Sequence, residues 1–363
     1  MPSLQTLPFE LLEQVTKSLC LRCTRRPSCR CSSDCIIDVS TYKSSICHTR
    51  PSWDPEARTR ALGALCLTSH RLKDAATRHL YHHPHTKKWW LLAGTLLRQP
   101  RLARDVKTLY LPDKMGVYLP EKAALPPEFL SFYQAQLDHY SASVPEDEFR
   151  QRRDQRIWEI NGDNDIVAML SSLCPAVETI EAVVTEDVVF HLCPPASLPS
   201  LRTVELGFWG IEGEGGIPLR SLVPLFKAAP NLVVLRCHSM SDEEGGVGLG
   251  VTAGTVEEVE FLNSAISADA LRSLLEGCPG LKTFRYAAGS FCAGFAQFRW
   301  SQARDLIIEH APRLERVVID FAGLVTWDSL AEWEGWDEEQ TEREVKSFKG
   351  RRIEFEVTGI HHD

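Results

Sequence analysis

The sequence predicts an α/β fold, in which a short helical module precedes an irregular solenoid of repeats with a parallel sheet. Three observations predict it: an amphipathic segment near the start, a seven-residue phrase that recurs in the second half, and helical patterns between its copies. The 363 residues allow more than one cooperative unit. We expect the helical module at residues 1–83, a helical linking segment at 84–160 and the repeats at 161–358.

The first predicted helix lies in residues 7–20, with the sequence LPFELLEQVTKSLC. On a 3.6-residue period its apolar residues share one face: Pro8, Leu11, Leu12, Val15 and Leu19. A proline suits the first turn of a helix, so the start is well defined. A helix this short is marginal alone in water and needs a partner for its apolar face.

Residues 61–83, ALGALCLTSHRLKDAATRHLYHH, supply that partner. They carry apolar residues at helical spacings, and the Thr68–Ser69 pair suits the start of a helix. A unit this small cannot cover all of its apolar side chains, so we expect Phe9, Leu12 and Leu67 to remain as a surplus. An exposed apolar surplus usually marks a protein partner.

The strings LPFELLEQV at 7–15 and ALCLTSHRL at 64–72 together resemble the F-box. The continuation through residues 96–111 is similar to the stretch that follows the F-box in many fungal members. The resemblance implies docking onto a small acidic Skp-type adaptor of a cullin–RING ubiquitin ligase. The residues that it implies for this contact are Leu7, Pro8, Leu11, Leu12, Val15, Leu65 and Leu67.

The chain departs from the F-box pattern at about residues 20–58, where a cysteine-rich insertion replaces a short loop between the first two helices. An insertion in a surface loop costs little closure entropy, so the helical module can retain its fold. The adaptor surface nearby could still be altered.

Thiols and one imidazole crowd this insertion: Cys20, Cys23, Cys29, Cys31, Cys35, Cys47 and His48. The two-residue gap of Cys20-x-x-Cys23 lets one turn place both sulfurs on a metal. A second pair of ligands could come from one of the next three cysteines with Cys47 or His48. Two interpretations stay open: a structural zinc site, or a disordered basic loop rich in thiols.

Four histidines follow at the end of the second helical segment: His79, His82, His83 and His85. They resemble another metal cluster. Because Pro84 interrupts them and no carboxylate accompanies them, we interpret them as surface residues at the helix end.

The recurring phrase in the second half is exemplified by Cys174-Pro-Ala-Val177-Glu-Thr-Ile180. The fourth residues of its copies are spaced by 24 to 33 residues: Val177, Leu201, Leu232, Val256, Leu281 and Leu314. Leucine-rich repeats have periods of roughly 20 to 29 residues, and the pattern resembles the irregular leucine-rich repeats of F-box proteins. A strand and a helix in each copy cannot bury their own apolar face, but stacked copies can. Residues 106–111 and 351–360 are expected to add further strands.

The concave side of such a solenoid would be lined by residues between the apolar anchors: Arg202, Glu205, Arg236, Glu260 and Arg285. These are the natural candidates for recognising a target protein. The alternative interpretation is that each is an ordinary solvated strand residue.

The sequence offers no motif for catalysis: G-x-S-x-G, H-E-x-x-H and G-x-x-x-x-G-K-[ST] are all absent. Asp163 and Asp165 start like a calcium loop, but Ala168 and Cys174 stand where glycine and glutamate are required. Asn164 or Asp165 is expected to cap a helix instead. We therefore predict a non-catalytic, substrate-recruiting ligase subunit, with a repeat scaffold not coupled to ubiquitination as the alternative.

The composition, 44% hydrophobic and 25% charged, is that of an ordinary soluble globular protein, and the net charge of −9 argues against nucleic-acid binding. The start lacks the features of a signal peptide, and no apolar stretch is long enough to cross a bilayer. Twelve cysteines without an export signal suggest reduced thiols or metal ligands. We expect a cytoplasmic or nuclear protein with no membrane partner and no cofactor other than possible structural zinc.

Overall fold

The computed structural model of the 363-residue chain describes residues in eleven stretches. They are residues 7–20, 23, 55–86, 88–111, 125–143, 163–184, 189–208, 216–241, 249–289, 300–320 and 354–358. Within this part of the chain, none of the helices combines the length and the hydrophobicity needed to cross a lipid bilayer.

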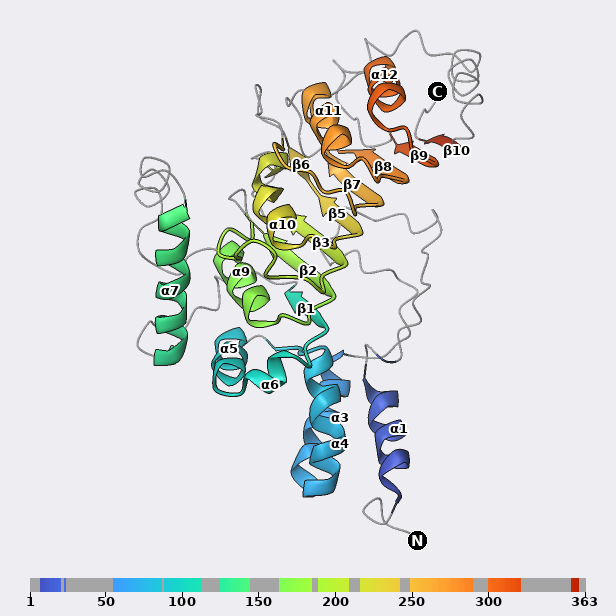
Figure 1. The fold of residues 1–363 in the computed structure, drawn as a ribbon. Coiled ribbons are helices and arrows are strands. Elements are labelled where there is room, and N and C mark those ends of the chain that lie inside the picture. The colour runs from blue at the N-terminus through green and yellow to red at the C-terminus, as the bar shows by residue number, and fades with distance from the viewer. Residues whose placement is uncertain are drawn as a thin grey trace.

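The N-terminal part is helical, as predicted, and consists of α1 (Phe9–Leu19), α3 (Pro55–Thr68) and α4 (His70–His82) (Figure 1). Ser69 begins α4 as expected, because its hydroxyl accepts a hydrogen bond of 3.2 Å from the backbone N–H of Leu72. Leu12, Leu72 and Ala75 form a small buried cluster between α1 and α4, with Leu7 and Leu65 partly buried against it. The three helices therefore share a core of few residues.

The next segment contains α5 (Trp89–Arg98), α6 (Pro100–Ala103) and α7 (Pro127–Ser143). Trp89 is fully buried, and its ring lies 5.3 Å from that of Phe129 on α7. Both residues belong to the hydrophobic cluster that continues into the sheet. These helices thus pack against the sheet region. The last part of the expected helical linking segment, residues 144–160, lies outside the described residues.

The second half confirms the α/β class with its parallel sheet. In the described ranges eight strands form one parallel sheet, and helices line one of its faces (Figure 1). In spatial order the strands are β1 (Thr108–Leu111), β2 (Thr179–Val184), β3 (Thr203–Phe208), β5 (Val234–His238), β7 (Glu258–Ser264), β8 (Thr283–Ala288), β9 (Arg316–Asp320) and β10 (Glu354–Thr358). The helices between them are α9 (Asp163–Leu173), the 3-10 helix η4 (Leu219–Leu222), α10 (Val223–Ala228), α11 (Ala268–Gly277) and α12 (Trp300–His310). A small parallel pair, β4 (Ile217–Pro218) and β6 (Met240–Ser241), lies at the end of two repeats.

The recurring phrase sets the register of this sheet. In every copy the backbone N–H of the fourth residue donates to the carbonyl of the first, at 3.0 to 3.2 Å. The seventh residues then pair side by side across six strands: Ile180, Val204, Leu235, Val259, Phe284 and Val317. All six are fully buried toward the helices. The same turn therefore precedes each of these six strands, and their seventh residues are in register. This confirms the expected repeat of turn and strand.

Candidate metal centre

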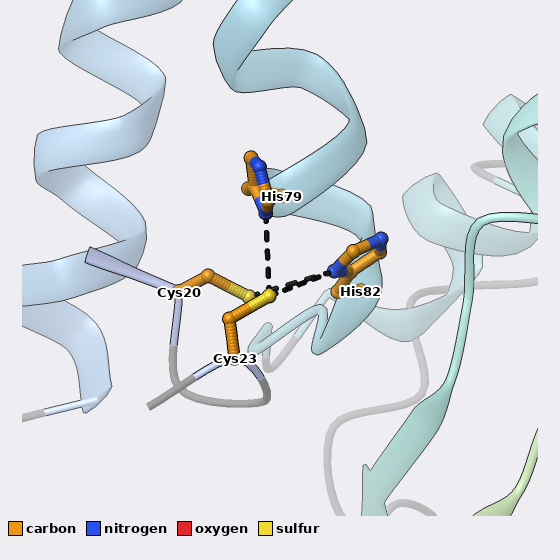
Figure 2. A group of neighbouring side chains, drawn as sticks. All are labelled: Cys20, Cys23, His79 and His82. Atoms are coloured by element: carbon orange, nitrogen blue, oxygen red, sulfur yellow. Dashed lines mark hydrogen bonds between the residues drawn. The ribbon is translucent and has the colours of Figure 1, made fainter. Parts of the chain in front are cut away.

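Four metal-ligating side chains meet where α1 ends against the last turns of α4. They are Cys20, Cys23, His79 and His82, and their ligand atoms all lie within 4.8 Å of one another (Figure 2). The two thiols come from the end of the first helix, and the two imidazoles come from one side of α4. This group could hold a metal ion.

The cysteines are positioned by the way in which α1 stops. The backbone N–H of Cys20 donates to the carbonyls of both Thr16 and Lys17, and the chain then turns to an extended conformation. The buried hydroxyl of Thr16 lies 3.0 Å from the carbonyl of Glu13 and 3.3 Å from that of Ala75. The contact to Ala75 brings the C-terminal end of α1 against α4. Cys20 is consequently buried beside the histidines.

Helical spacing places the two imidazoles on the same side of α4. His79 and His82 are three residues apart, so they lie on one face of α4. Their rings pack edge to face with centroids 5.0 Å apart. The carbonyl of His82 accepts a 3.0 Å hydrogen bond from the backbone N–H of Lys107, which attaches the end of α4 to the chain that enters β1. One side of the site is therefore fixed to the sheet.

The separations of sulfur and nitrogen match those around one tetrahedral ion. Cys20 Sγ lies 3.6 Å from His82 Nδ1, and Cys23 Sγ lies 3.6 Å from His79 Nδ1 and 3.7 Å from His82 Nδ1. A tetrahedral zinc ion with bonds of about 2.3 Å to sulfur and about 2.05 Å to nitrogen places these atoms about 3.6 Å apart. The same three pairs are within hydrogen-bond reach, and in each pair either the thiol or the imidazole can be the donor. One ion bound to all four ligands accounts for all three separations.

The surroundings of His79 favour the state of the imidazole that binds metal. Cys20, His79 and His82 are 1%, 6% and 7% exposed, so little water competes for the site. Burial lowers the pKa of His79, and the positive charge of Arg78 lowers this pKa further. The imidazole is thereby kept neutral, which is the form that coordinates a metal.

The cysteines of the sheet region are of a different kind. Burial raises the pKa of the Cys174 and Cys278 thiols to about 12, and it also raises the pKa of Cys193 and Cys237. These four side chains therefore stay protonated and serve as small apolar groups in the core.

Half of this group agrees with the ligands expected from the sequence, and the other half was expected at the surface. Cys20 and Cys23 were expected as ligands, and the structure brings them together with His79 and His82. The interpretation of those histidines as surface residues is wrong, because Pro84 follows α4 and does not interrupt the pair. The available signal was His79-x-x-His82, a ligand pair at helical spacing. The other candidate ligands, Cys29, Cys31, Cys35, Cys47 and His48, lie outside the described residues.

The remaining two histidines join the helical part to the sheet. His83 is 8% exposed, which also differs from the expected surface position. The rings of His83 and His85 each stack on Tyr110 of β1, with centroids 5.9 Å apart in both cases. We therefore assign them to packing and not to the metal group.

The residues implied for adaptor docking differ in their burial. Pro8, Leu11, Val15 and Leu67 are exposed, whereas Leu7 and Leu65 are partly buried. Leu12 is completely buried in the cluster with Leu72 and Ala75, so the expectation that it would remain as surplus is wrong. The face of α1 that packs inward is centred on Leu12 and Thr16.

The candidate target-binding residues lie mostly in one row across the open face of the sheet. Glu205, Arg236, Glu260 and Arg285 occupy the same register position on β3, β5, β7 and β8. Arg236 pairs with Glu258 at 2.6 Å and with Glu260 at 3.0 Å, and Arg285 pairs with Glu260 at 2.9 Å. Arg202 stands apart, because it precedes β3 and its guanidinium donates to the carbonyl of Asn231 at 3.1 Å.

A second polar cluster is buried between α7 and α9. Asp165 accepts a hydrogen bond of 2.8 Å from the hydroxyl of Tyr133, and its other oxygen lies 3.1 Å from Nε2 of His191. The side chains of Asp165 and His191 are only 8% and 4% exposed, and the ring of Tyr140 packs on His191. Because α9 begins at Asp163, Asp165 is inside the helix and is not the expected cap. The cluster attaches α7 to the core.

No protein-family model matches this chain, and a comparison with curated proteins likewise finds no match. The function therefore has to be inferred from the residues of the chain itself and from the contacts that they make.

Proposed function

We propose that this chain is the substrate-recognition subunit of a Skp–cullin–F-box ubiquitin ligase. The observation that carries the proposal is the distribution of large exposed apolar side chains in the described residues. Four of the five are on α1 and α3: Phe9, Leu11, Val15 and Leu67, with exposed fractions of 41%, 43%, 36% and 89%. These are parts of the two strings that resemble the F-box.

The helical module is too small to bury these groups itself. Leu11 and Val15 are one turn apart on the same side of α1, away from the face that covers Leu12. Leu67 lies in the last turn of α3. Complete burial of an exposed apolar side chain contributes about 1.5 to 3 kcal/mol, so covering the exposed parts of these four side chains favours a protein partner. A Skp-type adaptor is the partner that the F-box resemblance implies.

We propose further that the repeats form a leucine-rich-repeat solenoid whose open face binds the target protein. The row from Glu205 to Arg285 supports this, since it offers a fixed pattern of both charges on the side of the sheet that the helices leave uncovered. The chain then acts by raising the concentration of a target near the ubiquitin-carrying enzyme, which requires no catalytic residue.

For the metal we propose zinc in a structural role. Two thiolates and two imidazoles suit zinc better than magnesium or calcium, which prefer oxygen ligands. Four protein ligands fill a tetrahedral shell and leave no position open for a substrate. Mass spectrometry of the purified native protein should find one zinc ion per chain, and a folded protein that takes up no zinc would rule the centre out.

Binding to a purified Skp-type adaptor tests the ligase proposal, measured by isothermal titration calorimetry on zinc-loaded protein. We expect Leu11→Asp and Leu67→Asp to weaken binding more than tenfold, because each buries a charge in the apolar contact. Leu91→Asp is the matched control, since Leu91 is 49% exposed but lies on α5. If the folded native chain does not bind, the scaffold not coupled to ubiquitination becomes the better account.

A further inference from the structure

We infer that the metal centre is a clasp that holds α1 against α4 and thereby assembles the adaptor-docking face. The centre crosslinks the end of α1 to the last turns of α4, across 62 residues of sequence between Cys20 and His82. The effect on docking rests on the proposed ligase function, whereas the effect on α1 does not.

The other attachments of α1 are few. Of its eleven residues only Leu12 and Thr16 are buried. Leu12 packs on Leu72 and Ala75, and Thr16 bonds the carbonyl of Ala75. An isolated helix of this length is marginal in water, so two buried side chains leave it weakly held. A crosslink at its end adds the restraint that packing does not provide.

The two helices that follow one another in the described residues are far apart in the sequence. The helix α1 ends at Leu19 and α3 begins at Pro55, so a long stretch of sequence separates them. Holding the two ends of a long chain segment together costs conformational entropy, and this cost rises slowly with the length of the segment. Metal coordination closes such a segment at a fixed point, because both thiols and both imidazoles must converge on one ion.

The position of the clasp also determines the docking face. Leu11 and Val15 are on α1, whereas Leu67 is on α3, which packs against α4. Cys20 lies five residues beyond Val15, so an ion at Cys20 fixes the helix within two turns of these side chains. When α1 is fixed to α4, the apolar side chains of α1 and α3 are held in one arrangement. Without the ion they are not.

Hydrogen–deuterium exchange on the full chain tests the clasp directly. The zinc-loaded protein is compared with protein stripped by a chelator and with stripped protein to which zinc is returned. We expect amides of α1 to exchange at least tenfold faster without zinc and to recover when it is returned. Amides of β5, β7 and β8 should not change, which shows that the chain remains folded. Unchanged exchange in α1 would overturn the inference.

Matched variants separate the ion from general damage. His79→Asn removes a ligand, whereas His70→Asn changes an exposed histidine at the start of the same helix. We expect the first to lose zinc and the protection of α1, and the second to retain both. If His79→Asn binds zinc and protects α1 as the native chain does, the assignment of the ligands is wrong.

Adaptor titrations with the same samples test the consequence for docking. We expect at least tenfold weaker binding after zinc is removed and full recovery when it is returned. Equal binding with and without zinc would overturn the coupling. If zinc-loaded protein does not bind the adaptor at all, the ligase proposal fails, while the exchange data still decide whether the clasp exists.

Discussion

The helical module and the sheet region are stabilised in different ways. In the part of the chain that the structure describes, the buried cluster between α1 and α4 consists of Leu12, Leu72 and Ala75, whereas one much larger cluster includes residues from Trp89 to Ile319. The six strands that follow a copy of the phrase lie side by side and repeat the same turn and register. The comparison shows that stacking repeats supply their own core, while a short helical module needs a crosslink or a partner.

The largest expected effect is on the stability of the sheet region. Phe284 is fully buried on β8, and its ring lies 6.4 Å from that of Phe261 on β7. Phe284→Ala should lower the free energy of unfolding by about 3 to 5 kcal/mol, because it leaves a cavity between two strands. Urea denaturation followed by circular dichroism measures the change. Phe284→Leu, which keeps most of the volume, should cost clearly less; equal losses would contradict the cavity argument.

A smaller and more local effect is expected in the helical module. Leu12→Ala should destabilise the packing of α1 on α4 by about 2 to 4 kcal/mol, since Leu12 is the central buried side chain of α1. Hydrogen exchange at amides of α1 and α4 measures this, and the urea transition of the sheet should stay in place. Leu11→Ala is the control, because Leu11 is 43% exposed and its loss should change stability by less than about 0.5 kcal/mol. If Leu12→Ala shifts the urea transition of the sheet together with the exchange of α1 and α4, the two regions are not stabilised separately.

Most of the sheet was predictable because its signals are local. The recurring phrase ending in Ile180 or Phe284 places a turn, a strand and a buried residue within seven positions. Helical patterns precede several of the copies in the sequence, and they were likewise correct for α9, α10, α11 and α12. The ion pairs of Arg236 on the open face were not predictable in the same way, because they depend on which strands are neighbours.

The metal group was only half predictable for a related reason. Cys20-x-x-Cys23 is a local signal, but the partners His79 and His82 are more than fifty residues away in sequence. Only the packing of α1 on α4, centred on Leu12, brings the two halves together. Because the insertion contains further cysteines, the remaining ligands were expected there. Two ligand pairs, each spaced three residues apart in the sequence, would have been the better guide.

The smallest expected effect concerns the charges on the open face of the sheet. A double-mutant cycle on Arg285 and Glu260 should give a coupling of about 0.5 to 1 kcal/mol that decreases in high salt, because the pair is partly solvated. Glu260 also pairs with Arg236, so Glu260→Ala should cost more than Arg285→Ala in urea denaturation. A coupling above about 2 kcal/mol would mean that the row is a structural element.

The small expected loss of stability on the open face of the sheet distinguishes this surface from the exposed surface of α1. On α1, the exposed Leu11 and Val15 belong to a helix in which only Leu12 and Thr16 are buried. On the sheet, Arg285 can be replaced with the core intact, because the fully buried Phe284 next to it points to the other face. Loss of a target protein from Arg285→Ala, with an unchanged urea midpoint, would therefore report a direct contact. Retention of the target would move the search to other parts of the open face.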